Sequence, residues 1–181
     1  MISQLQILAG TMADDSAVGT VAWLTPNGAK VLNDSSYAIS PMNMDDTWHG
    51  WDNEVKIVKS DGTIGTTNKA DTVNAWHYPP TYIPYGSSSE LWNETWTAED
   101  INDIDFGVVL SVKRTDVDTS TTDYSHYLKA TNFGFTIPTG ATINGILVEI
   151  NKNTGSGGIL VDHIRITVYY TISPFPTFFR V

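Results

Sequence analysis

Residues 161–171 read Val161-Asp162-His163-Ile164-Arg165-Ile166-Thr167-Val168-Tyr169-Tyr170-Thr171, and this stretch decides the fold class. Its apolar and polar side chains alternate with a period of two, the period of a β-strand whose side chains point to opposite faces of a sheet. One face would carry Ile164, Ile166, Val168 and Tyr170, and the other would carry His163, Arg165, Thr167 and Tyr169. The pattern predicts a half-buried antiparallel strand.

The same alternation recurs along the chain, with almost no helical periodicity. It predicts further strands over residues 18–24, 29–32, 37–39, 55–59, 105–113, 124–137 and 143–152. Residues 60–96 hold several prolines and the run Gly86-Ser87-Ser88-Ser89, so long loops with one edge strand are expected there. Thr97 and Asp100 have the spacing of a capping box, which predicts one short helical turn near residues 98–103. We therefore predict an all-β protein, a single antiparallel β-sandwich of jelly-roll-like type.

The chain of 181 residues is long enough for one sizeable core, and we expect one domain with two arms. Residues 1–20 are weakly patterned and are predicted to form an N-terminal arm, residues 21–171 the sandwich, and residues 172–181 a C-terminal arm. The C-terminal arm carries Phe175, Phe178 and Phe179. Because exposed aromatic clusters are costly, we expect these rings to pack on the sandwich or on a neighbouring subunit.

The net charge of −10 comes from twenty acidic and ten basic residues spread along the chain. Such a charge repels phosphate groups, so we expect neither nucleic acid nor a membrane surface as a partner. The chain has no cysteine, which excludes disulfides and thiolate metal sites. We expect no export signal and no membrane helix, although a leader that has been removed stays an alternative. The composition nevertheless resembles that of proteins found outside cells.

Three segments together carry a resemblance to a known group of proteins. They are residues 85–108, which include Leu91-Trp92 and Thr97-Ala98-Glu99-Asp100, then residues 133–146, with Phe133-Gly134-Phe135-Thr136-Ile137-Pro138-Thr139-Gly140, and finally residues 161–171. Their order resembles β-sandwich structural proteins of tailed bacteriophages and prophage-like regions, and of some extracellular bacterial proteins. The resemblance implies an architecture and a context rather than a chemistry. It implies a virion protein, made in the host cytoplasm and released by lysis, as a capsid decoration or a tail component.

No combination of residues predicts catalysis, a cofactor or a metal centre. The serines at 87–89 lack both a nucleophile-elbow motif and a histidine close in sequence. The four histidines, His49, His77, His126 and His163, lack the close spacing of a metal site, and we expect them to be ordinary surface or hydrogen-bonded residues. The segment 116–123 offers several carboxylates. It departs from the EF-hand pattern at Thr121 and Tyr127, so only an irregular calcium loop around Asp116 and Asp118 stays open.

Aromatic residues are concentrated in the loop-rich part of the chain, between residues 48 and 96. Aromatic rings stack on sugars and also anchor protein interfaces, while many simply close one end of a sandwich. All three alternatives are open for this cluster. The candidate interface or glycan-stacking residues are Trp48, Trp51, Trp76, Tyr78 and Trp92, together with Phe175, Phe178 and Phe179 of the C-terminal arm.

These observations lead to two functional hypotheses. The first is a non-enzymatic bacteriophage virion protein that assembles with other virion proteins and with copies of itself, for example as a trimer. The second is a carbohydrate-binding module or adhesin that uses the loop tryptophans and recognises a host-surface glycan. The two can coexist, since a tail protein can also bind host glycans.

Overall fold

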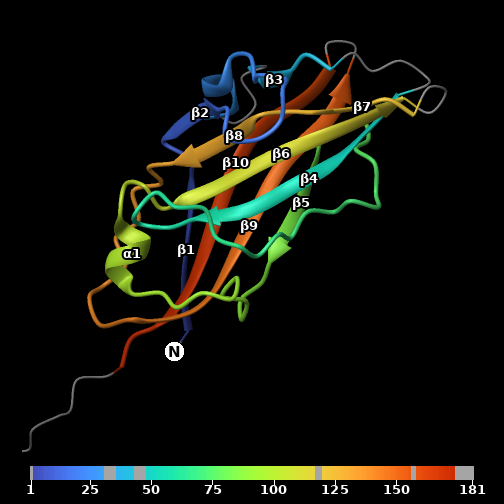
Figure 1. The fold of residues 1–181 in the computed structure, drawn as a ribbon. Helices are drawn as coiled ribbons and strands as arrows, with labels where there is room; N and C mark the ends of the chain where they lie inside the picture. Colours follow the sequence, from blue (N-terminus) through green and yellow to red (C-terminus); the bar gives the residue numbers. More distant parts are fainter. Residues whose placement is uncertain (1, 31–35, 43–47, 117–119, 156–157, 174–181) are drawn as a thin grey trace, which may run out of the picture.

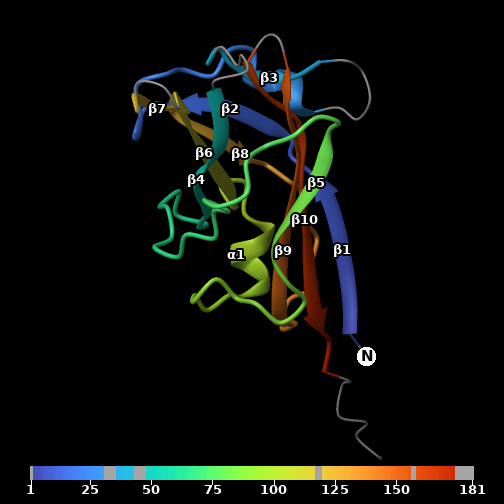
Figure 2. The same cartoon turned by 90° about the vertical axis from the view of Figure 1, so that its right-hand side faces the viewer.

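The computed structural model describes residues 2–30, 36–42, 48–116, 120–155 and 158–173. Two five-stranded antiparallel sheets pack face to face (Figures 1 and 2). Sheet A contains β1 (Ile2–Leu8), β10 (Gly158–Thr171), β9 (Thr142–Gly155) and β5 (Thr81–Gly86) in this order, with β3 (Ala38–Ser40) also paired to β10. Sheet B contains β2 (Thr11–Asp15), β8 (Tyr127–Thr131), β6 (Gly107–Asp116) and β4 (Trp48–Val58), with β7 (Thr122–Tyr124) also paired to β6. The prediction of an antiparallel β-sandwich is confirmed.

The core lies between the two sheets and follows the predicted alternation. Ile164, Ile166 and Val168 of β10 are fully buried, as are the inward side chains of the neighbouring strands. The inward residues of these neighbours are Ile146, Val148 and Ile150 on β9, and Val108, Leu110 and Val112 on β6. Each inward face excludes water from the other, and this burial supplies the main driving force for folding.

The predicted helical turn is present as α1 (Ala98–Asn102), which lies at one end of the molecule (Figure 1). The side chain of Thr97 accepts the backbone N–H of Asp100, and the Asp100 carboxylate accepts the backbone N–H of Thr97. This reciprocal pair is a capping box. The expected edge strand between residues 60 and 96 is also present, because β5 pairs with β9 alone within the described part of the chain.

The expected N-terminal arm is wrong for residues 2–15. β1 pairs along its whole length with β10, and β2 pairs with β8, so these residues form part of both sheets. The apolar signal of β1 is weak because an edge strand packs only one short row of side chains on the core, here Leu5 and Ile7. Of the expected C-terminal arm, Ile172 and Ser173 are described, and residues 174–181 lie outside the described range.

Three of the predicted strands also need correction. Residues 18–24 contribute only isolated bridges at Val21 and Leu24, although Trp23 is buried. Residues 26–30 form the 3-10 helix η1 (Pro26–Lys30), so the strand expected from residue 29 is absent from the described part of that range. The strand predicted over 124–137 ends at Thr131. Phe133, Phe135 and Ile137 still point into the core, so an apolar alternation alone did not establish strand pairing.

Two β-bulges, one in β4 and one in β10, change which side chains of the strand point into the core. In β4, Asp52 pairs with Val112 and Glu54 pairs with Ser111, so Asn53 is an extra residue. In β10, Val161 pairs with Lys152 and His163 pairs with Asn151, so Asp162 is an extra residue. An extra residue shifts the alternation by one position. These bulges create the two polar clusters described next.

Candidate functional site

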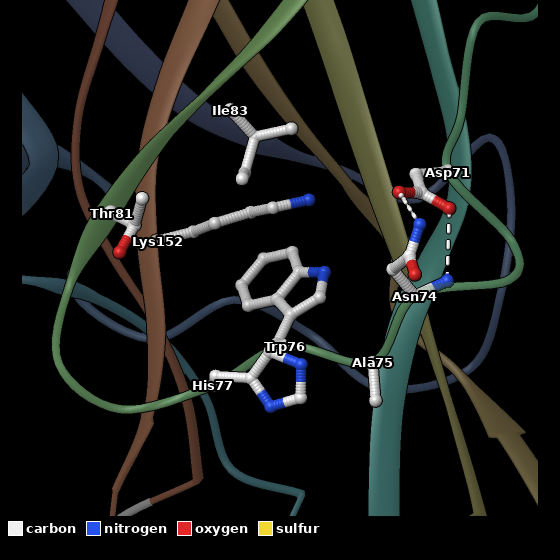
Figure 3. A pocket seen from close by; sticks show the side chains of 8 residues that line it. All are labelled: Asp71, Asn74, Ala75, Trp76, His77, Thr81, Ile83 and Lys152. Atoms are coloured by element: carbon white, nitrogen blue, oxygen red, sulfur yellow. Dashed lines mark hydrogen bonds between the residues drawn. The ribbon is translucent and has the colours of Figure 1, made fainter.

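The inter-sheet cluster consists of Asp52, Trp76, Tyr85 and Lys152 (Figure 3 shows Trp76 and Lys152). Asp52 comes from β4 of sheet B, while Tyr85 and Lys152 come from β5 and β9 of sheet A. Val55 and Ile57 of β4 face the core, so a regular strand would turn Asp52 outward. The bulge at Asn53 turns it inward instead.

The Asp52 carboxylate is 0% exposed and accepts three hydrogen bonds from the loop before β5 and from β5 itself. Its Oδ1 accepts the indole N–H of Trp76 at 2.8 Å. Its Oδ2 accepts the Tyr85 hydroxyl at 2.7 Å and the backbone N–H of Asp71 at 2.9 Å. A buried carboxylate is tolerated only when its oxygens are satisfied in this way.

Lys152 is the partner of Asp52 across the two sheets. Its side chain is 5% exposed, and Nζ contacts both Asp52 Oδ1 and the Tyr85 hydroxyl, the latter at 2.5 Å. The ammonium also lies 4.5 Å from the centre of the Trp76 ring, a cation–π contact. Burial lowers the pKa of Lys152, and the Asp52 charge opposes this shift. Burial, followed by the Asp52 charge, raises the pKa of Tyr85, so its hydroxyl stays protonated.

A cavity of about 150 Å³ adjoins this cluster (Figure 3). Its lining comes from the loop residues Asp71, Asn74, Ala75, Trp76 and His77 and from the strand residues Thr81, Ile83 and Lys152. Asp71 accepts the backbone N–H of Asn74 at 2.9 Å and the side-chain amide of Asn74 at 2.8 Å, and these bonds hold its pKa below the usual value. The cavity has room for a ligand of about the size of a benzene ring.

A second polar cluster lies on the outer face of sheet A and consists of Asp162, His163 and Tyr82. Asp162 Oδ2 lies 2.6 Å from His163 Nδ1, and the Tyr82 hydroxyl contacts His163 Nε2. A carboxylate only accepts hydrogen bonds, so Nδ1 donates to Asp162, and in the neutral form of the ring Nε2 accepts the hydroxyl of Tyr82. The guanidinium of Arg165 covers the Tyr82 ring at 3.9 Å and pairs with Glu149 through two nitrogen atoms. These contacts join β5, β9 and β10.

The structure places two of the candidate tryptophans, Trp76 and Trp92, in the interior, the third of the alternatives left open for this cluster. Trp76 is 6% and Trp92 is 1% exposed, and both belong to the hydrophobic core. Lys152 occupies one face of the Trp76 ring, and the Trp92 indole N–H donates to the backbone oxygen of Ile146 at 3.0 Å. Neither ring therefore offers a free face for a sugar. Both rings are buried in the core. The alternation of apolar and polar residues does not predict the burial of a side chain in a loop, because a loop has no regular faces.

Of the other candidate residues, the structure describes the side chains of Trp51 and Tyr78. Tyr78 is 78% exposed, and Trp51 is half-buried with the Lys113 ammonium 5.9 Å from its ring centre. The side chain of Trp48 and residues Phe175, Phe178 and Phe179 lie outside the described part of the structure. The same holds for the Asp116 side chain and for Asp118 of the expected calcium loop.

One expectation for the histidines is corrected, and His126 is hydrogen-bonded as expected. His163 was expected on the solvent face of the last strand, but it is 1% exposed, because Tyr82 and Asp162 enclose it. His126 pairs with Asp14 at 2.9 Å. Among the described residues, no group of three or more His, Cys, Asp or Glu side chains could hold a metal ion.

Asp52, Tyr85 and Lys152 were not expected from the sequence to form one cluster. A signal for Lys152 existed, because it continues the inward parity of Ile146, Val148 and Ile150 on β9. A lysine in the core row of a strand requires a buried partner. The partner could not be identified from the sequence, because Asp52 lies 100 residues away and reaches the core only through a bulge.

The fold and this site define an all-β sandwich whose two sheets are joined by a buried ion pair. Comparison of the chain with models of protein families, with curated proteins and with solved structures found no match. Within the described residues, no helix is long and apolar enough to span a bilayer.

Proposed function

We propose that this protein is a non-enzymatic structural protein of a tailed-bacteriophage particle, a capsid decoration or a tail component, that acts by assembling with copies of itself and with other virion proteins. The virion context rests on the resemblance of residues 85–108, 133–146 and 161–171. The self-assembly rests on one structural observation, the unprotected outer edge of β1.

Three of the four long outer strands carry features that keep other chains from pairing with them. The β5 edge contains Pro84, which lacks a backbone donor, and β2 carries Asp14 and Asp15. The β4 edge is covered by the loop that follows it, since Gly65, Lys69 and Trp76 donate backbone N–H groups to β4 carbonyls at 2.8–2.9 Å. These edges are closed to a further strand.

Among the residues that the structure describes, the β1 edge has none of these features. Its seven residues, Ile2–Leu8, include no charged residue and no proline, and they pair with β10 without a bulge. Within the described part of the chain, no strand pairs with its outer edge. Ile2 is 69% exposed and lies opposite Thr171, beside the exposed Ile172. A long uncharged edge of this kind favours pairing with another chain.

We assign this edge to a second copy of the chain. Antiparallel pairing of β1 with β1 is related by a two-fold axis, so each copy contributes the same surface and sheet A continues across the contact. The contact yields a dimer, and a trimer would need a second interface.

Light scattering over a range of concentrations tests this contact. The wild-type protein is expected to show the mass of a dimer or of a larger assembly. Gln4→Lys places a charge on the exposed row of β1 and is expected to raise the dissociation constant about tenfold or more, because the two copies bring their charges together. Thr11→Lys adds the same charge to the protected edge of β2 and should leave the mass unchanged.

A monomeric wild-type protein at all concentrations would contradict self-assembly through β1. The virion context is tested separately, by mass spectrometry of density-purified phage particles from the source culture. Recovery of the protein in the particle fraction is expected. Its recovery only in the particle-free fraction would contradict the assignment.

A further inference from the structure

The contact between Lys152 and Asp52 has a geometry that supports a covalent reaction. Nζ of Lys152 touches Asp52 Oδ1 between the two sheets, in a region lined by Trp76 and Tyr85. Both side chains are almost completely buried. We propose that Lys152 and Asp52 are joined by an isopeptide bond, an amide between Lys152 Nζ and Asp52 Cγ that forms within the folded chain and ties sheet A to sheet B.

Burial supplies the reactive protonation states. An amine attacks a carboxyl group only when the amine is neutral, and a carboxylic acid is a far better acceptor than a carboxylate. In a medium of low polarity, a charged pair loses its hydration, and transfer of one proton from ammonium to carboxylate gives a neutral pair. The lowered pKa of Lys152 agrees with this direction, and its main cause is burial.

The Tyr85 hydroxyl is placed to carry the protons. It accepts a hydrogen bond from Lys152 Nζ at 2.5 Å and donates one to Asp52 Oδ2 at 2.7 Å. Nζ loses two protons in succession to the Tyr85 hydroxyl. Each time Tyr85 takes a proton from Nζ, it gives a proton to Oδ2. The first transfer gives the neutral pair. Then the Nζ–Cγ bond forms, the second proton moves, the Cγ–Oδ2 bond breaks, and Oδ2 departs as water.

Other donors stabilise the intermediate. Oδ1 of Asp52 carries the negative charge when Nζ adds to Cγ, and it accepts the indole N–H of Trp76 at 2.8 Å. The departing Oδ2 accepts the backbone N–H of Asp71 at 2.9 Å. Fixed donors aimed at a developing charge lower the barrier without reorganisation. No oxidant, metal or external reagent is required, because the only product besides the amide is water.

A second lysine–carboxylate pair of the chain serves as a comparison. Lys56 and Glu54 are also in direct contact, at 2.7 Å, but their side chains are 19% and 23% exposed. This pair therefore stays in contact with water and lacks the enclosed surroundings that the reaction requires. We therefore expect a covalent bond at 52 and 152 and an ordinary ion pair at 54 and 56.

The intact mass of the purified wild-type protein under denaturing conditions tests the proposal. The expected mass is lower than the sequence mass by one water molecule, and a digest should contain a branched peptide joining residue 52 to residue 152. Electrophoresis under denaturing conditions should show faster migration, because the bond closes a loop between positions 100 residues apart. A mass equal to that of the sequence would overturn the proposal. So would a water loss mapped to another position, such as a succinimide at Asp61-Gly62.

Variants add a check on the chemistry. Asp52→Asn should release ammonia instead of water and so give a product of the same mass as the cross-linked wild type. Lys152→Arg should retain the full sequence mass, and Lys56→Arg should still lose water. Tyr85→Phe should slow formation of the bond by about 10²-fold or more, because the proton relay is lost. The wild-type mass decides the proposal even if a variant does not fold, and it is independent of the oligomeric state.

Discussion

A β-bulge determines the surroundings of His163 on β10. Its ring lies on the outer face of sheet A yet is 1% exposed, because Tyr82 closes over it and Asp162 holds its other nitrogen. Asp162 is the extra residue of the bulge, and the bulge brings two consecutive side chains together on one face. The three side chains satisfy one another's hydrogen-bonding groups, so the burial of each depends on the other two.

Removal of one hydroxyl should therefore be costly. Tyr82→Phe leaves His163 Nε2 buried without a donor, and we expect the free energy of unfolding to fall by about 1–3 kcal/mol. Tyr78→Phe removes the same hydroxyl from a ring that is 78% exposed and should have no measurable effect. Urea unfolding followed by fluorescence measures both. Equal midpoints for the two variants would show that the Tyr82 contact contributes nothing.

At the scale of elements, the capping box determines where α1 begins. Thr97 and Asp100 satisfy each other's backbone N–H groups, and Asp100 also accepts the hydroxyl of Ser60 at 2.8 Å. The cap therefore connects the short helix to the turn after β4. Ile101 and Ala98 of the helix are buried, so the position of α1 matters for the core.

Thr97→Ala removes the cap acceptor and should destabilise the protein by about 1 kcal/mol. Thr95→Ala is the matched control, because Thr95 is exposed and lies two residues earlier, outside the capping box. Chemical denaturation of both variants tests the expectation. A loss of the same size in Thr95→Ala would mean that the effect comes from the loop rather than from the cap.

At the scale of the whole molecule, stability depends on one core shared by both sheets. Ile150 is fully buried on β9 and lies opposite Ile164 of β10 and Ile83 of β5. Because native cores are close-packed, a shortened side chain at this position leaves a cavity that the sheets cannot fill completely.

We expect Ile150→Ala to lower the free energy of unfolding by about 2–5 kcal/mol, from lost burial and from the cavity. Leu147→Ala, on the opposite face of β9 where the side chain is half-buried, should cost clearly less. Thermal and urea unfolding of the two variants give the comparison. Similar losses would mean that the outer face of sheet A is packed as tightly as the core, as it would be under a partner.

Much of the fold was predictable from local patterns. The alternation over residues 161–171 identified β10 and its core row, and the spacing of Thr97 and Asp100 identified α1. The edge strand within residues 60–96 was also expected and is β5. Pro138 and Gly140 are typical turn residues, and a turn forms there, with Gly140 at positive φ and the Ala141 N–H donated to the oxygen of Pro138. These features depend mainly on residues that are close in sequence, so local patterns are enough to predict them.

The candidate site required the tertiary structure. Asp52 faces the core only because β4 gains an extra residue against β6, and a bulge depends on the register of a partner strand rather than on the residues that form it. The sequence left open whether Trp76 and Trp92 lie on the surface or close one end of the sandwich, and the structure buries both. By itself the sequence determined an antiparallel sandwich with a capped helical turn. Only the folded chain decided that Asp52 and Lys152 meet, since their contact joins two sheets across 100 residues.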